Sequence, residues 1–283
     1  MTMRKINIIE IEKKVRNLCA KANIVLRSDV NAAIFKACRS KNETPLVRKM
    51  LKILLENARL AKEEKLPICQ DTGITEVFLK IGEQVILTGG NLTDAVNRGI
   101  KKSYAENYFR KSVVRDPLLR KNTKTNTPGI LHVEIIRGNK VKITVMPKGF
   151  GSENKSALFM LNPTAGAKEV ERVSVDVVKT AGSNACPPYI LGIGLGGTAE
   201  FAARLAKKAL LRPINKANKK YHLAELEKNI MKKANALKIG VMGLGGMTTV
   251  LGVNIEAAPT HIAGLPVAIN LSCHALRSAS ATI

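Results

Sequence analysis

Apolar residues recur every three to four positions over much of the first third of the chain, which predicts helices there. We expect a helix over residues 8–23, a short second helix that Ser28 and Asp29 would cap, and a long amphipathic helix over 44–65 that ends before Pro67. Residues 74–82 then alternate apolar and polar side chains, which predicts a strand. Residues 69–73 therefore fall in a loop between a helix and a strand.

The rest of the chain combines segments with helical periodicity and segments that alternate as strands do. Residues 130–147 contain two alternating runs joined at Gly138 and Asn139, which predicts two strands paired as a hairpin. Further helices are expected at 93–111, 167–181, 198–211 and 221–238, and further strands at 189–193, 250–256 and 267–271. The pattern predicts a mixed α+β fold, in which a helical N-terminal part packs with a hairpin-containing mixed sheet. It is not the regular alternation of a doubly wound Rossmann fold.

Two glycine-rich segments follow predicted strands. Gly192, Gly194 and Gly197 match G-x-G-x-x-G, but the following helix runs into another helix, and not into the second strand that a dinucleotide fold requires. We interpret these glycines as a loop whose backbone amides, at a helix N-terminus, face an anion. The segment K-G-F-G-S-E-N-K-S at 148–156 fits an anion cradle and a simple turn equally well.

Of the 283 residues, 45% are apolar and 24% are charged, a composition typical of a soluble globular protein. The net charge, however, is +24. A field of that size attracts nucleic acid, anionic substrates or an acidic partner. The lysines alternate with glutamates on helical faces and aromatic residues make up only 4%, so nucleic-acid binding is the remote alternative. No apolar run suits a secretory signal or a membrane span, and we expect a cytoplasmic protein without membrane contact.

The five cysteines are too few and too scattered for a disulfide framework. Cys19 and Cys38 lie inside helical patterns, where a small apolar side chain is usually part of the core. Cys69, Cys186 and Cys273 each lie in a loop-like context, and their separations of 117 and 87 residues match no zinc-ribbon spacing. Spacing alone therefore fits three unrelated buried thiols.

Five segments, in order from about residue 40 to the C-terminus, resemble the catalytic half of the iron–sulfur class I fumarate hydratases. The same half occurs in the α subunit of L-tartrate dehydratase. The segments are P-I-C-Q-D-T-G, N-T-P-G-I-L-H-V-E-I, K-I-T-V-M-P-K-G-F-G-S-E-N, S-N-A-C-P-P-Y-I-L-G-I-G-L-G-G-T-A-E-F-A and A-P-T-H-I-A-G-L-P-V-A-I-N-L-S-C-H-A-L-R.

This resemblance implies that Cys69, Cys186 and Cys273 each bind one iron of a 4Fe-4S cluster, whose fourth iron has no protein ligand. An iron without a protein ligand can act as a Lewis acid on a substrate's hydroxyl and carboxylate groups. Residues next to a cysteine that binds the cluster are held close to the molecule that this iron binds. By the resemblance, Gln70 contacts a substrate carboxylate and Asp71 takes part in proton transfer.

The resemblance also implies other site residues. His261 matches an active-site histidine of the family, although by itself it would be taken for a structural histidine, and the donor and acceptor roles of Asp71 and His261 stay open. Arg110 matches an arginine that binds a substrate carboxylate through two hydrogen bonds, with Arg115 as second choice. Gly151 is expected to supply a backbone donor to the substrate.

Single-chain members of the family continue into a second domain that contacts the substrate, whereas this sequence ends at H-A-L-R-S-A-S-A-T-I. We therefore expect residues 1–283 to form a single catalytic iron–sulfur domain, with room for two lobes, in the α subunit of a hydro-lyase. A separately encoded β subunit should complete the enzyme in a higher-order α/β oligomer. The expected reaction on a dicarboxylate substrate is reversible hydration of fumarate to (S)-malate, and dehydration of L(+)-tartrate is the alternative.

Overall fold

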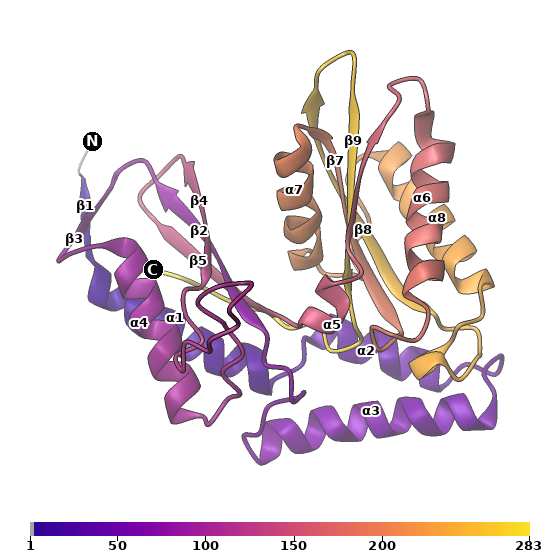
Figure 1. The fold of residues 1–283 in the computed structure, drawn as a ribbon, viewed down its shortest axis with the longest axis horizontal. Coiled ribbons are helices and arrows are strands. Elements are labelled where there is room, and N and C mark those ends of the chain that lie inside the picture. Colours follow the sequence, from indigo (N-terminus) through magenta and orange to yellow (C-terminus); the bar gives the residue numbers. More distant parts are fainter. Residues whose placement is uncertain (1–2) are drawn as a thin grey trace. The chain divides into compact units, whose positions relative to one another are not determined.

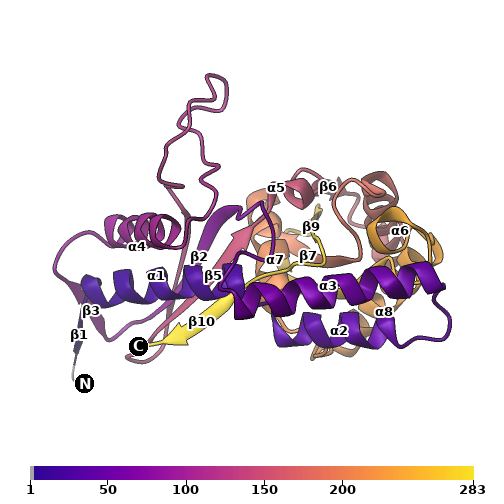
Figure 2. The same cartoon turned by 90° about the horizontal axis from the view of Figure 1, so that it is seen from below.

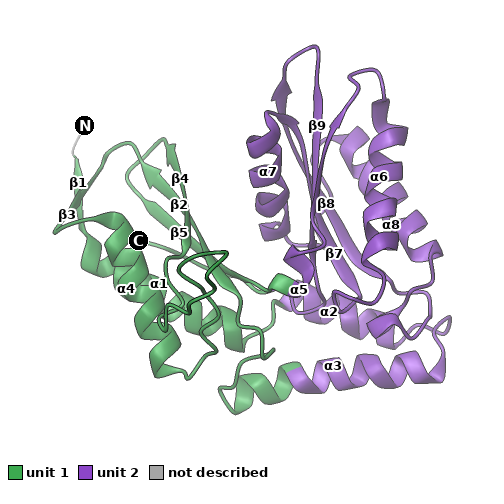
Figure 3. Ribbon diagram, viewed as in Figure 1, with its two compact units in different colours: residues 1–27, 58–150, 277–283 green, residues 28–57, 151–276 purple. Residues whose placement is uncertain are grey.

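A computed structural model describes residues 3–283 and divides the chain into two compact units (Figure 3). Unit 1 comprises residues 1–27, 58–150 and 277–283, and unit 2 comprises residues 28–57 and 151–276. Helix α3 (Pro45–Glu63) contains one of the boundaries between them. None of the helices in the described part of the chain is long and apolar enough to cross a membrane.

The sheet of unit 1 has the strand order β10-β5-β2-β4. Strand β2 (Ile74–Gly82) runs parallel to β4 (Ile130–Ile136) and antiparallel to β5 (Val141–Lys148). The C-terminal strand β10 (Ala279–Thr282) pairs with β5. A separate parallel pair is formed by β1 (Arg4–Asn7) and β3 (Val85–Thr88). The C-terminal strand β10 and the N-terminal strand β1 thus belong to the same unit.

The two strands predicted at 130–147 are present, but they do not form a hairpin, because β2 lies between them. Their connection at Gly138 closes around the end of β2: Gln84 N donates to Gly138 O at 3.1 Å, and a Cβ on Gly82 would lie 2.2 Å from that oxygen. Alternation of side chains identifies a strand with one buried face but not its neighbour. The α+β class without regular β-α-β alternation is confirmed.

Helices α1 (Ile8–Ile24) and α4 (Leu92–Glu106) pack against each other in unit 1 (Figure 2). The side chain of Asn7 caps α1 and that of Asn91 caps α4, each by accepting a hydrogen bond from a first-turn N–H. Glu12 on α1 accepts hydrogen bonds from Lys102 at 2.5 Å and Arg98 at 2.7 Å. These bonds hold the pKa of Glu12 below its usual range. The apolar core of this unit draws on α1, α4, β2 and β5, and includes Ile11, Val15, Val77, Ile100 and Ile143.

Unit 2 is built on a sheet of order β6-β9-β7-β8. Helix α7 covers one face, and α6 and α8 cover the other (Figure 1). The strands are β6 (Ala157–Leu161), β7 (Tyr189–Gly197), β8 (Val250–Thr260) and β9 (Leu265–Ser272). The remaining elements are α2 (Ser28–Cys38), α5 (Phe150–Glu153), α6 (Gly166–Ala181), α7 (Ala199–Leu211), α8 (Tyr221–Ala236) and the 3₁₀ turn η1 (Val241–Gly243).

The glycines of the G-x-G-x-x-G pattern have a different role from the predicted one. Gly192 and Gly194 lie inside β7, where an added Cβ would come within 2.1 Å of Ala206 O and 2.0 Å of Ala202 O. Both alanines belong to α7 and are buried. These two glycines therefore allow α7 to pack closely on the sheet, and the interpretation that they form an anion-facing loop is wrong.

Candidate active site

The loop that carries Cys69 begins where α3 ends. Lys65 adopts a left-handed conformation with φ of 56°, and Leu66 N donates to Ala61 O at 2.9 Å. This is the six-to-one hydrogen bond of a Schellman motif, here with a lysine in the position that usually holds glycine. Pro67 follows and cannot continue the helix. The chain therefore leaves α3 in a defined direction before it reaches Cys69.

Hydrogen bonds from three segments of unit 1 hold this loop. Ile68 N donates to Asn23 O at 2.9 Å, at the end of α1. The buried hydroxyl of Tyr104, on α4, donates to Thr72 O at 2.6 Å, and Thr72 Oγ1 donates to Arg110 O at 2.7 Å. Burial raises the pKa of Tyr104 to about 12, so its phenol remains a donor at neutral pH. The loop is thus a fixed part of the unit.

Gly73 ends the loop and allows a close approach between main chains. Its φ is 71°, and a Cβ would lie 2.5 Å from Lys148 O on β5. Its carbonyl accepts a hydrogen bond from the buried Asn126 side chain at 3.0 Å. A larger residue would be strained in φ and would clash, so the position requires glycine.

The side chains of the loop are partly open to solvent. Cys69 is half-buried, and its Sγ lies 3.3 Å from Oε1 of the exposed Gln70. The carboxylate of the half-buried Asp71 accepts hydrogen bonds from two main-chain amides, Gly73 N to Oδ1 at 2.9 Å and Phe150 N to Oδ2 at 2.8 Å. These bonds fix the orientation of Asp71, which is the condition a group must meet to transfer a proton at a defined atom.

Arg110 lies beside the same loop, because its carbonyl accepts the hydrogen bond from Thr72. Its side chain is exposed. Arg115, the second choice, is also exposed, and its main chain N donates to Lys121 O at 2.8 Å in the α4–β4 connection, which extends away from the sheet of unit 1 in Figure 2. Contact with the Cys69 loop favours Arg110 over Arg115.

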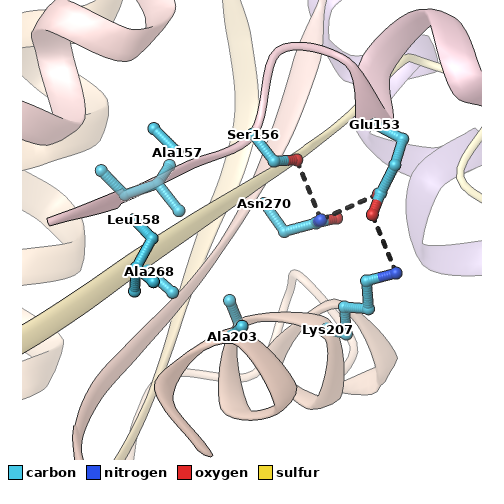
Figure 4. A pocket seen from close by; sticks show the side chains of 10 residues that line it. Glu153, Ser156, Ala157, Leu158, Ala203, Lys207, Ala268 and Asn270 are labelled. Carbon is cyan, nitrogen blue, oxygen red and sulfur yellow. Dashed lines mark hydrogen bonds and ion pairs between the residues drawn. The ribbon is translucent and has the colours of Figure 1, made fainter. Parts of the chain in front are cut away.

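Gly151 lies in α5, and no atom lies within 4 Å of where its Cβ would be. The end of α5 is tied to the rest of unit 2 around a pocket of about 200 Å³ (Figure 4). Glu153 accepts from Lys207 Nζ at 2.8 Å and from Asn270 Nδ2 at 2.9 Å, and the same amide donates to Ser156 Oγ at 2.9 Å. This network fixes the Gly151 segment to β9, whose end leads into Cys273.

Cys186 and Cys273 lie on adjacent segments of unit 2. His274 N donates to Cys186 O at 3.4 Å, and His274 Nδ1 lies 3.1 Å from the same oxygen. Burial raises the pKa of Tyr189 to about 12, and the negative charge that Cys186 and Cys273 carry as thiolates adds to this rise. Cys186 has a φ of 54° and is exposed. The structure therefore brings these two of the predicted ligands together.

His261 lies elsewhere in unit 2. It is exposed in the turn between β8 and β9, where its Nδ1 accepts from Ala263 N at 3.2 Å. Cys273 follows the opposite end of β9, and an eight-residue strand separates them by roughly 25 Å. Within this unit the structure does not bring His261 to the cysteine pair.

All five cysteines lie in the described part of the chain, and none forms a disulfide. Cys19 and Cys38 are buried, and burial raises the pKa of the Cys19 thiol. The other three are accessible: Cys186 and Cys273 in unit 2, and Cys69 in unit 1. Among residues 3–283 no three Cys, His, Asp or Glu side chains are grouped so as to hold a metal ion. As a donor set, three accessible thiols in loops fit the ligation of an iron–sulfur cluster.

Sequence reasoning missed the polar residues that hold these segments in place. Each is at most 4% exposed. For those on a helix or strand, only their place on an otherwise apolar face could have revealed them, whereas Asn126 and Arg277 lie outside helices and strands, where no local pattern marks them. They are Asn23, Tyr104, Asn126, Asn270 and Arg277.

Comparison with known proteins identifies the family. The family model described as Fumarate hydratase (Fumerase) matches residues 12–282. A protein of Methanocaldococcus jannaschii with the provisional name L(+)-tartrate dehydratase subunit alpha is 40% identical over 277 residues, which is 96% of each chain. L(+)-tartrate dehydratase subunit alpha of Escherichia coli K12 is 31% identical over 227 residues, 79% of this chain and 75% of its own length. The chain therefore belongs to the fumarate hydratase (fumerase) family of hydro-lyases.

Proposed function

We propose that this chain is the α subunit of a two-subunit iron–sulfur hydro-lyase that reversibly hydrates fumarate to (S)-malate. The match of the fumarate hydratase family over residues 12–282 carries the proposal. It is supported by the loop of Cys69, which places an accessible thiol, an amide and an oriented carboxylate in three consecutive residues.

In this proposal Cys69, Cys186 and Cys273 hold a 4Fe-4S cluster. When bound, the cluster would supply one iron without a protein ligand, which can polarise a substrate's hydroxyl and carboxylate. Support comes from the accessibility of these three thiols and from the adjacency of the last two. Cys19 and Cys38 are assigned to the core.

The chain's own residues would bind the dicarboxylate and move its proton. Gln70 and Arg110 would offer an amide and a guanidinium to the substrate carboxylates. Gly151, which has open space where a Cβ would be, would offer its backbone N–H. Asp71 would take the proton from the carbon next to the hydroxyl-bearing carbon during dehydration and return it during hydration. We assign this role to Asp71 and not to His261, since His261 lies at the far end of β9 from Cys273.

The proposal includes a separately encoded β subunit and an α/β oligomer, because the relatives of this chain are named as alpha subunits. The two units of this chain would together form one catalytic module. We place the enzyme in the cytoplasm, where thiols remain reduced and can bind iron.

A second candidate is dehydration of L(+)-tartrate. The names of the relatives with 31–40% identity favour it. The two substrates differ in one hydroxyl group, which a site reads through a small number of polar contacts. Either activity would use the same residues of this chain.

The test is an anaerobic assay of the reconstituted α/β pair with fumarate, (S)-malate and L-tartrate. We expect turnover of fumarate and malate, and a higher kcat/KM for tartrate would select the second candidate. Asp71→Asn should lower kcat by about 10²- to 10⁴-fold, because a general acid–base group is removed. Asp116→Asn is the matched control: Asp116 also accepts two main-chain N–H bonds, but in the α4–β4 connection. An equal loss in both variants would contradict the role of Asp71.

A further inference from the structure

Unit 1 contains a buried arginine that pairs with no carboxylate in the described part of the chain. Arg277 is 3% exposed and lies in the sequence between the end of unit 2 and β10. Its guanidinium donates from Nη2 to Asp71 O at 2.8 Å and from Nη1 to Asn23 Oδ1 at 3.3 Å. Among residues 3–283 its Nε has no hydrogen-bond partner.

Stability alone does not account for this guanidinium. Taking a cation out of water costs free energy that a carboxylate or several hydrogen bonds must offset, and a well-packed apolar residue avoids that cost. The two hydrogen bonds of Arg277 go to neutral oxygens. Its position must therefore be explained by what those two bonds hold.

The two acceptors of Arg277 fix both ends of the segment that carries Cys69. At one end, Asn23 receives Arg277 on its side chain and Ile68 N on its carbonyl oxygen, the latter at 2.9 Å. At the other end, Arg277 bonds the carbonyl of Asp71 directly. A guanidinium presents its donors in a planar, rigid fork, so it sets the spacing of the two acceptors as a flexible ammonium could not.

Arg277 also lies close to the oriented carboxylate. A Cβ on Gly149 would lie 3.3 Å from Asp71 Oδ2 and 3.7 Å from Arg277 Nη2. The hydrogen bonds from Arg277 to Asp71 O and Asn23 Oδ1 are called the clamp below. The clamp holds the main chain of Asp71, and the hydrogen bonds from Gly73 N and Phe150 N hold its side chain.

We propose that Arg277 is a positioning residue that presets the segment 68–71, so that Cys69, Gln70 and Asp71 are presented in one geometry. This rests on the proposed function, to which it adds a residue that does not touch the substrate. A catalytic group displaced by about 1 Å can lose roughly 10²-fold in rate, so loss of the clamp should appear mainly in kcat.

The first test uses the full chain without its cofactor. Amide hydrogen exchange over residues 66–73 should be at least about tenfold faster in Arg277→Met than in the unaltered chain, since loss of about 1.4 kcal/mol corresponds to that factor. Arg212→Met is the matched control, because Arg212 is also largely buried but belongs to unit 2, where it pairs with Glu227. It should leave exchange over 66–73 unchanged. Equal exchange over 66–73 in Arg277→Met and the unaltered chain would overturn the proposal.

The second test uses the reconstituted α/β pair. We expect Arg277→Met to lower kcat roughly 10²-fold with a smaller change in KM, and Arg277→Lys, which keeps the charge but not the fork, to restore part of the loss. If Arg277→Met does not fold, Arg277→Lys carries both tests, with intermediate values expected. Unchanged kcat in the folded variant would overturn the proposal. Absence of turnover in the unaltered pair would instead refute the proposed function, and hydrogen exchange would still decide whether Arg277 holds the segment.

Discussion

Replacement of Tyr104 by phenylalanine should loosen the Cys69 loop while leaving the ring in place. The ring is fully buried and lies edge-on to Phe109 with centroids 5.5 Å apart, contacts that phenylalanine keeps. The change removes the hydroxyl that donates to Thr72 O at 2.6 Å and accepts from Thr75 Oγ1 at 3.2 Å. A buried polar group left without its partner costs about 1–3 kcal/mol, and we expect the free energy of unfolding to fall by that amount.

Urea unfolding and amide hydrogen exchange would measure this effect. If the cost falls on local opening of the loop, exchange over residues 66–73 should rise roughly 5- to 150-fold, since 1.4 kcal/mol corresponds to a factor of ten. Tyr221→Phe is the control, because Tyr221 is 80% exposed and should change stability by less than about 0.5 kcal/mol. If Tyr104→Phe costs no more than Tyr221→Phe, the hydroxyl does not hold the loop and the reasoning fails.

Three further predictions concern other parts of the chain. Gly194→Ala should lower the free energy of unfolding by about 1–3 kcal/mol in a urea titration, because its Cβ would lie 2.0 Å from a main-chain oxygen of α7. The control is Gly264→Ala, whose Cβ would have no atom within 4 Å and which should change the free energy of unfolding by less than about 0.5 kcal/mol. Equal losses in the two variants would contradict the packing role of Gly194. Glu12→Gln should cost about 1 kcal/mol at pH 7. Because hydrogen bonds from two basic residues of α4 lower the folded-state pKa of Glu12, this difference should shrink as the pH falls below about 4.3, and thermal unfolding with a pH-independent difference would refute it. His261→Asn should lower kcat of the α/β pair far less than Asp71→Asn, and an equal loss would return His261 to proton transfer.

The sequence predicts where most elements lie but not which strands are neighbours. The helix expected at 8–23 is observed as Ile8–Ile24, and the strand expected at 74–82 as Ile74–Gly82. Periodicity reports one buried face of a segment, and this face is local information. The insertion of β2 between β4 and β5 depends on contacts between distant segments, and so does the return of the C-terminus to unit 1.

Glycine patterns were the least reliable guide to the site. The same G-x-G-x-x-G motif fits a phosphate-binding turn and a strand that a helix approaches closely. Only the atoms next to Gly192 and Gly194 in the structure distinguish these two cases. Burial likewise separated Cys19 and Cys38 from the other thiols, in agreement with their place in apolar helix faces. The contacts that hold the loop at 66–73 come from polar residues remote in the sequence, such as Arg277, whose role no local sequence pattern predicts.

The most direct test of the account is the iron and sulfide content of the chain after anaerobic reconstitution, with single serine variants of each cysteine side by side. We expect the unaltered chain to bind a 4Fe-4S cluster, seen in its visible absorbance and in the electron paramagnetic resonance of the reduced state. Cys69→Ser, Cys186→Ser and Cys273→Ser should each lose most of the iron, while Cys19→Ser and Cys38→Ser retain it. Equal retention in all five variants would contradict the claim that these three cysteines hold the cluster.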